Sequence, residues 1–314
     1  MLNEGYILEN RYKILSVAGK GGTSVVYRAA DIRANNAQRA VKEVLKDNGV
    51  DANNAMQEAE FIRVLYEKDV ENSFFPNIID IIRTPRAVYI VQDFINGKAM
   101  DKVITESGLN EKAVLSYAKE ICRFMSFIHK HNLIHSDMKP DNIMVVGNDN
   151  DIANKKTNNK FGKLKFIDFG SLIALKDGVF AFTPAYAAPE QLNEETLDER
   201  TDIFNMGATF YHMLTGKKPM TVSVNGKFMS SHERFVFDKK YNADLVRIIQ
   251  KCVNDDRNKR YRNCEELYDD LYKAENHTSV KVTGIVAAIT PTEITVDLGT
   301  KQSGYIPIAE LTDD

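Results

Sequence analysis

Short runs in which apolar and polar residues alternate dominate roughly the first 94 residues, a pattern typical of β-strands. Residues 54–66 differ from these runs, because their apolar positions recur every three or four residues, the period of an α-helix. The pattern therefore predicts a small β-rich region that contains one helix. The predicted strands cover residues 12–18, 24–30, 39–45, 78–82 and 87–94.

A longer helical region follows, after Asn96 and Gly97, which we expect to act as a hinge. Its longest segment, residues 111–131, repeats apolar residues at helical spacing over enough length to form a central helix. The asparagine-rich residues 148–160 predict a solvated hairpin insert rather than a basic docking patch. Further helices are predicted at residues 202–215, 245–252 and 265–273.

The composition changes near residues 275–279, and the chain then returns to predicted strands at residues 281–289, 293–298 and 304–308. A chain of 314 residues is long enough to bury a sizeable core. The changes of pattern divide it into a small lobe of about residues 1–95, a large lobe of about residues 96–277 and a C-terminal segment, residues 278–314.

Composition and charge exclude several classes of protein. With 43% hydrophobic and 27% charged residues the chain is typical of a globular protein, and a net charge of −3 gives no global attraction to nucleic acid. The widely spaced Cys122, Cys252 and Cys264 exclude a disulfide framework, and we expect them to be buried and reduced. The N-terminus lacks the apolar core of a signal peptide and no apolar run could cross a membrane, so we expect a cytoplasmic protein.

A cluster of glycines, Gly19, Gly21 and Gly22, lies between two predicted strands. A dinucleotide-binding glycine loop lies instead between a strand and a helix, so this context favours a β-hairpin flap over phosphates. Glycine suits that task because backbone N–H groups can approach phosphate oxygens where no Cβ intervenes. Taken alone, the cluster is better explained as a plain hairpin turn.

Lys42 lies within an apolar predicted strand, and a buried ammonium group needs an anionic partner because leaving it unpaired is costly. The predicted helix of the same region offers Glu58 and Glu60. Glu58 shares a helix face with apolar Ile62 and Leu65, whereas Glu60 shares its face with charged residues. We therefore expect Glu58 to pair with Lys42, although an ordinary surface lysine and glutamate also fit the local sequence.

Three further motifs follow in order along the chain: His135-Ser136-Asp137-Met138-Lys139-Pro140-Asp141-Asn142, Asp168-Phe169-Gly170 and Ala188-Pro189-Glu190. Together with the glycine cluster and Ala40-Val41-Lys42, this order resembles the motif set of protein kinases. Residues 11–273 resemble the eukaryotic-type (Hanks-type) Ser/Thr protein kinases of bacteria. The resemblance implies an α+β, two-lobed kinase fold over residues 1–277, with a small β-rich lobe and a larger helical lobe.

The resemblance also implies transfer of the γ-phosphate of ATP to Ser or Thr hydroxyls on proteins, a reaction that depends on positioning and charge neutralisation. Asp137 would orient the acceptor hydroxyl and take its proton, and Lys139 would neutralise charge on the transferred group. Thr183 corresponds to the threonine that bridges these two residues and favours Ser or Thr acceptors. Asn142 and Asp168 would hold Mg²⁺ or Mn²⁺ through oxygen ligands.

The resemblance assigns further residues to the nucleotide. Lys42, fixed by Glu58, would bind the α- and β-phosphates of ATP. The backbone of Asp93 and Ile95 would bond the edge of the adenine, next to Gln92 at the gatekeeper position, which is usually apolar. The adenine would be enclosed by Val26, Ala40 and Met144, and the phosphates would be covered by the loop that includes Gly19, Gly21 and Ser24.

Other matches to the family are structural in role. Asp202 resembles the buried helix aspartate that holds the catalytic loop. The resemblance implies that Glu190 pairs with Arg260, and a buried ion pair of this kind is costly to break. The hydrophobic stack that aligns the two lobes of an active kinase would be formed by Ile62, His135 and Phe169.

Besides Gln92, two residues depart from the kinase pattern. Ser136 replaces the arginine that in most family members binds a phosphate on the activation loop. Phe182 replaces the glycine usual before Thr183, and between Gly170 and Thr183 the only hydroxyl side chain is Ser171. We therefore expect activity that does not depend on phosphorylation of the activation loop.

Residues 280–314 resemble the opening strands of the RNA-binding OB-fold repeat of the largest small-subunit ribosomal protein. The match rests on Gly284-Ile285-Val286, the turn at residues 296–299, and Ser303-Gly304-Tyr305-Ile306-Pro307. A complete OB barrel has five strands and only three are predicted in this segment, so we expect the chain to stop inside a domain. RNA would be a partner only if that domain were completed, since the acidic tail offers little electrostatic attraction.

Two alternatives to an active kinase stay open. The chain could be a pseudokinase or scaffold that binds nucleotide without turnover, although Lys42, Glu58, Asp137, Asn142 and Asp168 are all present. It could also be directed to RNA or ribosomes by the C-terminal segment. A salt-dependent shift of single-stranded RNA that is lost on removal of the residues after Ser279 would support the second alternative.

Overall fold

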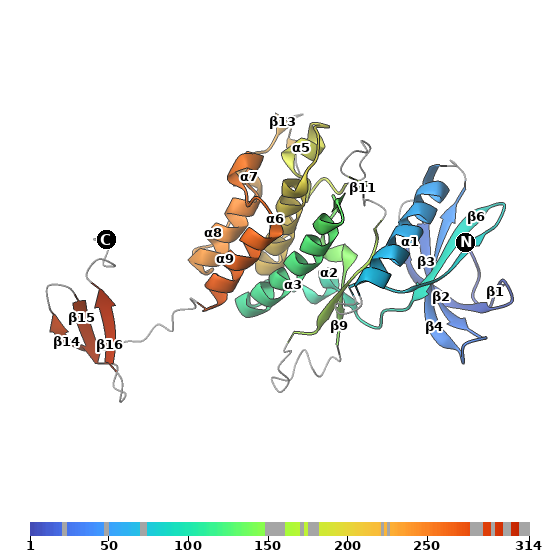
Figure 1. Cartoon of the computed structure of the whole chain (residues 1–314), viewed down its shortest axis with the longest axis horizontal. Coiled ribbons are helices and arrows are strands. Elements are labelled where there is room, and N and C mark those ends of the chain that lie inside the picture. The colour runs from blue at the N-terminus through green and yellow to red at the C-terminus, as the bar shows by residue number, and fades with distance from the viewer. Residues whose placement is uncertain are drawn as a thin grey trace. The chain divides into compact units, whose positions relative to one another are not determined.

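Two units of the chain, Met1–Lys273 and Ala274–Asp314, are distinguished in the computed structural model (Figure 1). The first unit carries two lobes, one built around a six-stranded sheet and one that contains most of the helices. The residues that the structure describes are 1–20, 24–46, 50–69, 74–147, 161–169, 173–174, 182–220, 223–224, 227–276, 285–289, 293–297 and 303–307.

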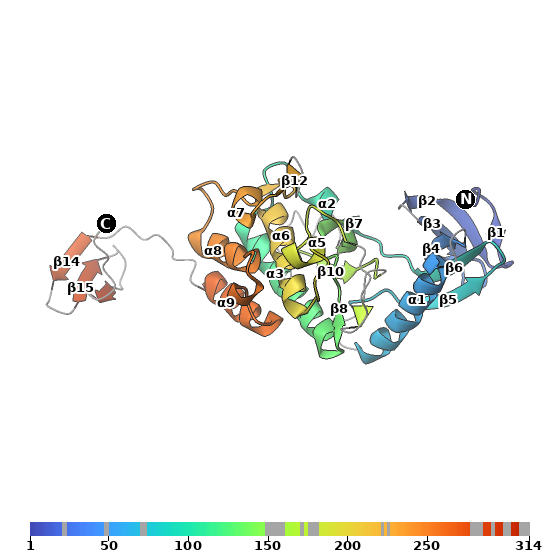
Figure 2. The same ribbon diagram turned by 90° about the horizontal axis from the view of Figure 1, so that it is seen from above.

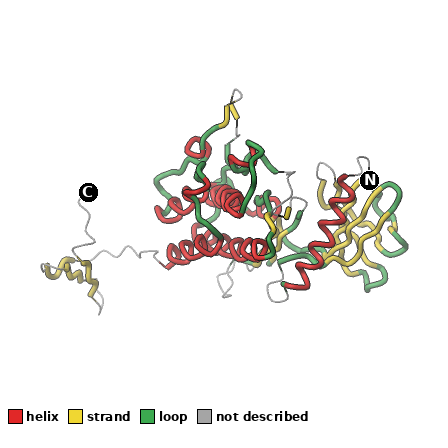
Figure 3. Tube along the Cα trace, turned by 45° about the horizontal axis from the view of Figure 1, so that its top comes forward, coloured by secondary structure: helices red, strands yellow, loops and turns green. Residues whose placement is uncertain are grey.

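An antiparallel sheet forms most of the small lobe (Figures 1 and 3). Its strands lie in the order β1-β2-β3-β4-β6-β5. Helix α1, Val50–Lys68, packs against β4, β5 and β6. The strands are β1 (Ile7–Leu8), β2 (Tyr12–Lys20), β3 (Ser24–Asp31), β4 (Ala37–Leu45), β5 (Ile78–Arg83) and β6 (Ala87–Asp93).

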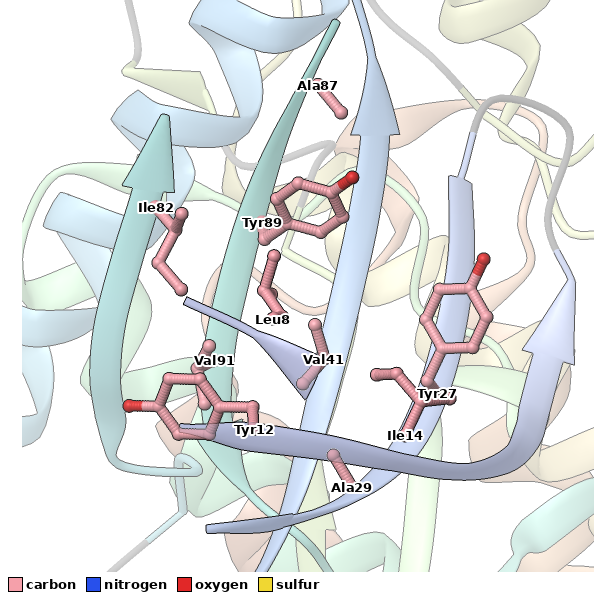
Figure 4. Close-up of a cluster of buried hydrophobic side chains, with 10 residues drawn as sticks. All are labelled: Leu8, Tyr12, Ile14, Tyr27, Ala29, Val41, Ile82, Ala87, Tyr89 and Val91. Carbon is pink, nitrogen blue, oxygen red and sulfur yellow. The ribbon is translucent and has the colours of Figure 1, made fainter. Parts of the chain in front are cut away.

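Alternation along the strands gives this sheet two different faces. One face carries a cluster of buried apolar side chains, to which β1 contributes Leu8 (Figure 4). Lys42 follows Val41 of that cluster in β4, so it points to the other face, beside its register neighbours Val26 and Ile90. The cluster consists of Leu8, Tyr12, Ile14, Tyr27, Ala29, Val41, Ile82, Ala87, Tyr89 and Val91.

Four long helices build the large lobe: α3 (Glu111–Lys130), α6 (Glu199–Thr215), α8 (Ala243–Cys252) and α9 (Cys264–Asn276) (Figure 2). Helix α6 packs against both α3 and α8, and nearly all of its residues are buried. Asp198 caps its first turn through a bond from the backbone N–H of Arg200. Gly216 ends it with a φ of +73°, where a Cβ would come within 2.4 Å of the Glu106 carbonyl oxygen.

Short elements complete the large lobe. Strand β9 pairs with β7 and β10, and β8 pairs with β11, which positions the loops that follow β8 and β10. These elements are β7 (Lys98–Ala99), α2 (Met100–Val103), β8 (Leu133–Ile134), η1 (Pro140–Asn142), β9 (Ile143–Val146), β10 (Lys163–Phe166), β11 (Ile173–Ala174), α5 (Pro189–Leu192), β12 (Ser223–Val224), β13 (Lys227–Phe228), α7 (Ser231–Arg234) and η2 (Arg257–Lys259).

The two-lobed α+β architecture predicted from the sequence is confirmed. The helix predicted at residues 54–66 extends from Val50 to Lys68, and β1 was not predicted, because two residues are too few to show alternation. The three cysteines are free and buried, as expected. The predicted hairpin insert at residues 148–160 lies outside the described residues.

The described residues of the second unit include three antiparallel strands: β14 (Ile285–Ile289), β15 (Glu293–Asp297) and β16 (Ser303–Pro307). The register shifts between Val286 and Ala288, which marks a β-bulge in β14. Strands were predicted in these three places, whereas the resemblance to an OB-fold repeat stays a prediction.

Across the described parts of the chain, no helix combines the length and the apolar character that a membrane span requires.

A buried ion pair joins two distant parts of the large lobe. Arg260 donates from Nη1 to Glu190 Oε1 at 2.6 Å and from Nη2 to Oε2 at 2.9 Å, and both side chains are almost fully buried. We expect Arg260→Met to lower the free energy of unfolding in urea by about 3–5 kcal/mol, because Glu190 is then buried without its cation. The exposed pair of Arg262 and Glu266 provides the control, since Arg262→Met should cost less than about 1 kcal/mol.

The contribution of this ion pair to stability depends on pH through the ionisation of Glu190. Burial works to raise the pKa of Glu190, but Arg260 outweighs it and holds that pKa below its ordinary value of 4.5. The pair therefore stabilises fully above about pH 4.5, and the effect is lost as the pH falls through the lowered native pKa. In Arg260→Met the main effect that opposes burial is removed and only hydrogen bonds such as the one from Thr201 remain, so acidification should relieve the defect. A variant that is as stable as the wild type at neutral pH would contradict this account.

Candidate active site

The loop of residues 135–142 joins β8 to β9, and one buried carboxylate fixes its start. Asp202 of α6 is fully buried and accepts bonds from the backbone N–H of His135 at 2.9 Å and of Ser136 at 2.7 Å. His129, near the end of α3, places Nε2 2.8 Å from the same carboxylate. Asp202 therefore ties this loop to two central helices.

Ser136 has a φ of +58°, a left-handed conformation that residues other than glycine rarely adopt. Its N–H donates to Asp202, and its carbonyl oxygen accepts a 2.6 Å bond from Nε2 of Gln191. Bonds on both sides of the residue hold this conformation in place. The position at which the chain departs from the kinase pattern is thus fully buried and bonded through its backbone.

A stripe of buried polar residues runs along helix α6, most of whose other buried residues are apolar: Asp202, Asn205, Thr209 and His212. Their spacing of three, four and three residues places them on one face of the helix. Thr209 Oγ1 donates to the carbonyl oxygen of Met138 at 3.0 Å, and Asn205 Nδ2 donates to the carbonyl oxygen of Tyr186 at 2.8 Å. We call this set the α6 polar stripe, and it contacts both the loop and the segment after Thr183.

Asp137, Lys139 and Thr183 form a closed set of contacts. Lys139 Nζ lies 2.5 Å from Asp137 Oδ2 and 2.6 Å from Thr183 Oγ1. The backbone N–H of Thr183 donates to Asp137 Oδ1 at 2.8 Å. All three partly buried residues were singled out from the sequence, and the structure brings them together at one point.

Lys42 connects the small lobe to the large lobe. Its Nζ lies 3.2 Å from both carboxylate oxygens of Glu58 on α1 and 3.3 Å from Asp168 Oδ1. Burial works to lower the pKa of Lys42, but the two carboxylates outweigh it and raise that pKa above its ordinary value. Glu60, the other candidate partner, is exposed. The choice of Glu58, which was based on the apolar face of the predicted helix, therefore gave the correct partner of this lysine.

Asn142 and Asp168 offer oxygen atoms that fit a divalent cation. Asn142 commits its Nδ2 to the carbonyl oxygen of Asp137 at 3.0 Å, which leaves its amide oxygen as the ligand atom. The N–H of Ile167 donates to the Asn142 carbonyl oxygen, so Asp168 follows directly beside it. Burial works to raise the pKa of Asp168, but Lys42 outweighs it and holds that pKa low, which keeps the carboxylate charged. Mg²⁺ that is bound together with phosphates typically takes only a few oxygen ligands from the protein, as one amide and one carboxylate oxygen would provide.

The predicted hydrophobic stack is buried. Ile62, His135 and Phe169 are each at most 2% exposed, and the rings of His135 and Phe169 lie 6.1 Å apart. The backbone N–H of Phe169 also donates to Glu58 Oε1 at 3.0 Å. The residue after Asp168 is therefore fixed to the same glutamate that pairs with Lys42.

The residues expected to enclose adenine lie in two sheets, Val26 and Ala40 on the adjoining strands β3 and β4 and Met144 on β9 of a separate sheet. Ala40 of β4 pairs with Gln92 of β6, and Met144 lies in β9. The backbone N–H of Asp93 is taken by the carbonyl oxygen of Asn77 at 3.0 Å. Of the loop predicted to cover the phosphates, Gly19 and Ser24 are described, as are Val26 and Ile95, while Gly21 lies outside the described residues. A Cβ at Gly19 would meet no protein atom within 4 Å, which leaves room above this strand.

Several functional contacts were not predicted. Gln191, Asn205, Thr209, His212 and Arg234 bond the loop or the segment after Thr183 through backbone groups or a buried hydroxyl. A signal for the three α6 residues was available, because polar residues at spacings of three and four interrupt an apolar helix. For Gln191 and Arg234 the local sequence carried no comparable signal.

The chain belongs to the protein kinase family, because the family model for the protein kinase domain matches residues 12–272. It is 31% identical over 291 residues to a probable serine/threonine-protein kinase of Clostridium acetobutylicum, a match that covers 87% of this chain and 41% of that relative. It is 28% identical over 297 residues to a probable serine/threonine-protein kinase of Clostridium perfringens, with 88% and 40% covered.

A third relative is the serine/threonine-protein kinase PknB of Mycobacterium tuberculosis, 27% identical over 294 residues, with 86% of this chain and 44% of that protein covered. The chain thus spans about two fifths of the length of these curated relatives.

Proposed function

We propose that this chain is a Ser/Thr protein kinase that transfers the γ-phosphate of ATP to hydroxyl groups of proteins. The observation that carries the proposal is the contact set of Asp137, Lys139 and Thr183, with distances of 2.5 to 2.8 Å. Membership of the protein kinase family and the names of the relatives support the same reaction.

Asp137 orients the acceptor hydroxyl and takes its proton as the oxygen attacks the γ-phosphorus. The new oxygen–phosphorus bond forms while the bond to the β-phosphate oxygen breaks, and ADP leaves. Lys139 contacts Asp137 and neutralises charge on the transferred group. Thr183 bonds both residues and so fixes their positions relative to each other.

Lys42 binds the α- and β-phosphates of ATP, since Glu58 and Asp168 keep it charged and aligned. Asn142 and Asp168 hold Mg²⁺, with Mn²⁺ as a substitute. When bound, the metal ion neutralises charge on the phosphates. The adenine lies against Val26, Ala40 and Met144, beside Gln92, with its edge on the backbone of Asp93 and Ile95.

The proposed kinase domain covers residues 1–277, with lobes at about 1–95 and 96–277. Residues 278–314 form a separate β segment, and the three strands of the second unit support this limit. Protein substrates carry the acceptor Ser or Thr. The proposed resemblance of the β segment to an OB-fold repeat adds RNA as a partner only in a completed domain.

Asp137→Asn is expected to slow phosphate transfer from labelled ATP with Mg²⁺ to histone, a generic basic acceptor, by about 10²- to 10⁴-fold. ATP binding should stay within about twofold, because the carboxylate acts on the acceptor rather than on the nucleotide. The exposed Asp244→Asn is the matched control and should transfer phosphate as the wild type does.

Each remaining result of this assay has a clear meaning. Transfer retained by Asp137→Asn would refute the role of Asp137. A wild type that binds ATP but transfers no phosphate would refute the kinase proposal and favour a nucleotide-binding scaffold.

Phosphorylation of the activation loop is not required in this proposal. Ser136 replaces the arginine that would bind such a phosphate, and its backbone is fixed by Asp202 and Gln191. Treatment with a phosphatase, with removal of phosphate checked by mass spectrometry, should leave the rate of transfer within about twofold. A loss of activity of several-fold that is restored by rephosphorylation would overturn this part of the proposal.

A further inference from the structure

Arg234 ends the short helix α7 and is only 1% exposed, although it carries a guanidinium group. Its Nη1 donates to the carbonyl oxygen of Ala187 at 3.1 Å, and its Nη2 donates to the carbonyl oxygen of Ala185 at 3.0 Å. The planar fork of an arginine can bond two acceptors at once, which a lysine cannot do in the same geometry. A single side chain thus holds two carbonyl groups that are two residues apart.

The charge of Arg234 is not balanced by a carboxylate in contact with it among the described residues. Burial lowers the pKa of this guanidinium to about 10, and Asp255 is the acidic residue that acts against that shift. The carboxylate of Asp255 is itself bonded by the backbone N–H and the hydroxyl of Ser231. The guanidinium lies instead over the rings of Phe204 and Phe235, at 5.4 and 5.2 Å. Its polar partners are therefore the two carbonyl groups, supported by aromatic faces.

The segment that Arg234 holds is continuous with Thr183, whose N–H bonds Asp137. Between Ala185 and Ala187 lies Tyr186, whose carbonyl oxygen accepts from Asn205 and whose hydroxyl lies 2.8 Å from Nδ1 of His212. Three successive carbonyl groups of this segment thus accept bonds from side chains of α6 and α7. Residues 185–187 begin two positions after Thr183, whose N–H contacts Asp137, the residue proposed to orient the acceptor hydroxyl.

We propose that Arg234 is a positioning residue for the acceptor protein: it fixes the backbone of residues 185–187, and with it the surface on which the acceptor lies next to Asp137. This inference rests on the proposed kinase function for its role in turnover. The hydrogen bonds that fix this segment come from α7 of the large lobe and do not involve a phosphate group. This agrees with Ser136, which replaces the arginine that would bind such a phosphate. Arg234 contributes to the binding of the acceptor and not to the binding of ATP.

The test compares Arg234→Met and Arg234→Lys with the wild type and with Arg247→Met, an exposed arginine of α8 that pairs with Asp270. Arg234→Met keeps much of the apolar stem and removes every donor, whereas Arg234→Lys keeps the charge and removes the fork. The first measurement is hydrogen–deuterium exchange of the backbone amides, which does not depend on turnover. The second is the KM for histone and for ATP in the transfer assay.

Both Arg234 variants should speed exchange in residues 185–188 while exchange in residues 203–213 of α6 stays as in the wild type. In the assay the KM for histone should rise roughly 3- to 10-fold and the KM for ATP should stay within about twofold, since each lost hydrogen bond is modest in free energy. Arg247→Met should match the wild type in both measurements.

Unchanged exchange and an unchanged KM for histone in both variants would overturn the inference. So would a full match of Arg234→Lys to the wild type, because charge alone would then suffice. Faster exchange throughout α6 in both variants would also overturn it, since Arg234 would then support the fold as a whole. If the wild type transfers no phosphate, the kinase proposal fails, while the exchange data still decide whether Arg234 holds this segment.

Discussion

The carboxylate of Asp202 is the interaction on which the geometry of the site depends. It is fully buried, it accepts the backbone N–H groups of His135 and Ser136, and it contacts His129. A buried carboxylate is costly to leave without its donors, and the bond from the N–H of Ser136 to this carboxylate, together with the bond from Gln191, stabilises the left-handed φ of Ser136. Helix α6 and the loop of residues 135–142 therefore stabilise each other, and these contacts determine the position of Asp137 in the loop.

A second carboxylate system links the lobes. Lys42 in the small lobe contacts Glu58 on α1 and Asp168 in the large lobe, and Glu58 also accepts the N–H of Phe169. Opposite charges that are partly removed from water attract strongly, so this set favours one arrangement of the lobes over others. Charge pairs thus position the residues proposed to bind the phosphates and the metal ion. Hydrogen bonds from α6 and α7 position residues 185–187, beside which the acceptor is proposed to bind.

Much of this site could be predicted from the sequence, because its motifs are short and their order is specific. The choice of Glu58 over Glu60 followed from helix periodicity alone, and the structure places Glu58 on Lys42. Arg234 and Gln191 could not be predicted in the same way. Both bond backbone carbonyl oxygens of distant segments, and such partners leave no trace in the residue types that they contact. The α6 polar stripe could be predicted only in part, because the sequence shows the spacing of its polar residues but not the groups that they bond.

Turnover of Asp202→Asn tests most directly whether Asp202 holds the site together. This change keeps the size of the side chain but replaces one accepting oxygen with an NH2 donor, so one of the two backbone N–H groups of the loop that carries Asp137 loses its acceptor. At saturating ATP and acceptor, kcat should fall by roughly tenfold or more, while the dissociation constant for ATP stays within about twofold of the wild type. An unchanged kcat, or an equal loss of ATP binding and turnover in a folded variant, would contradict the central role of Asp202.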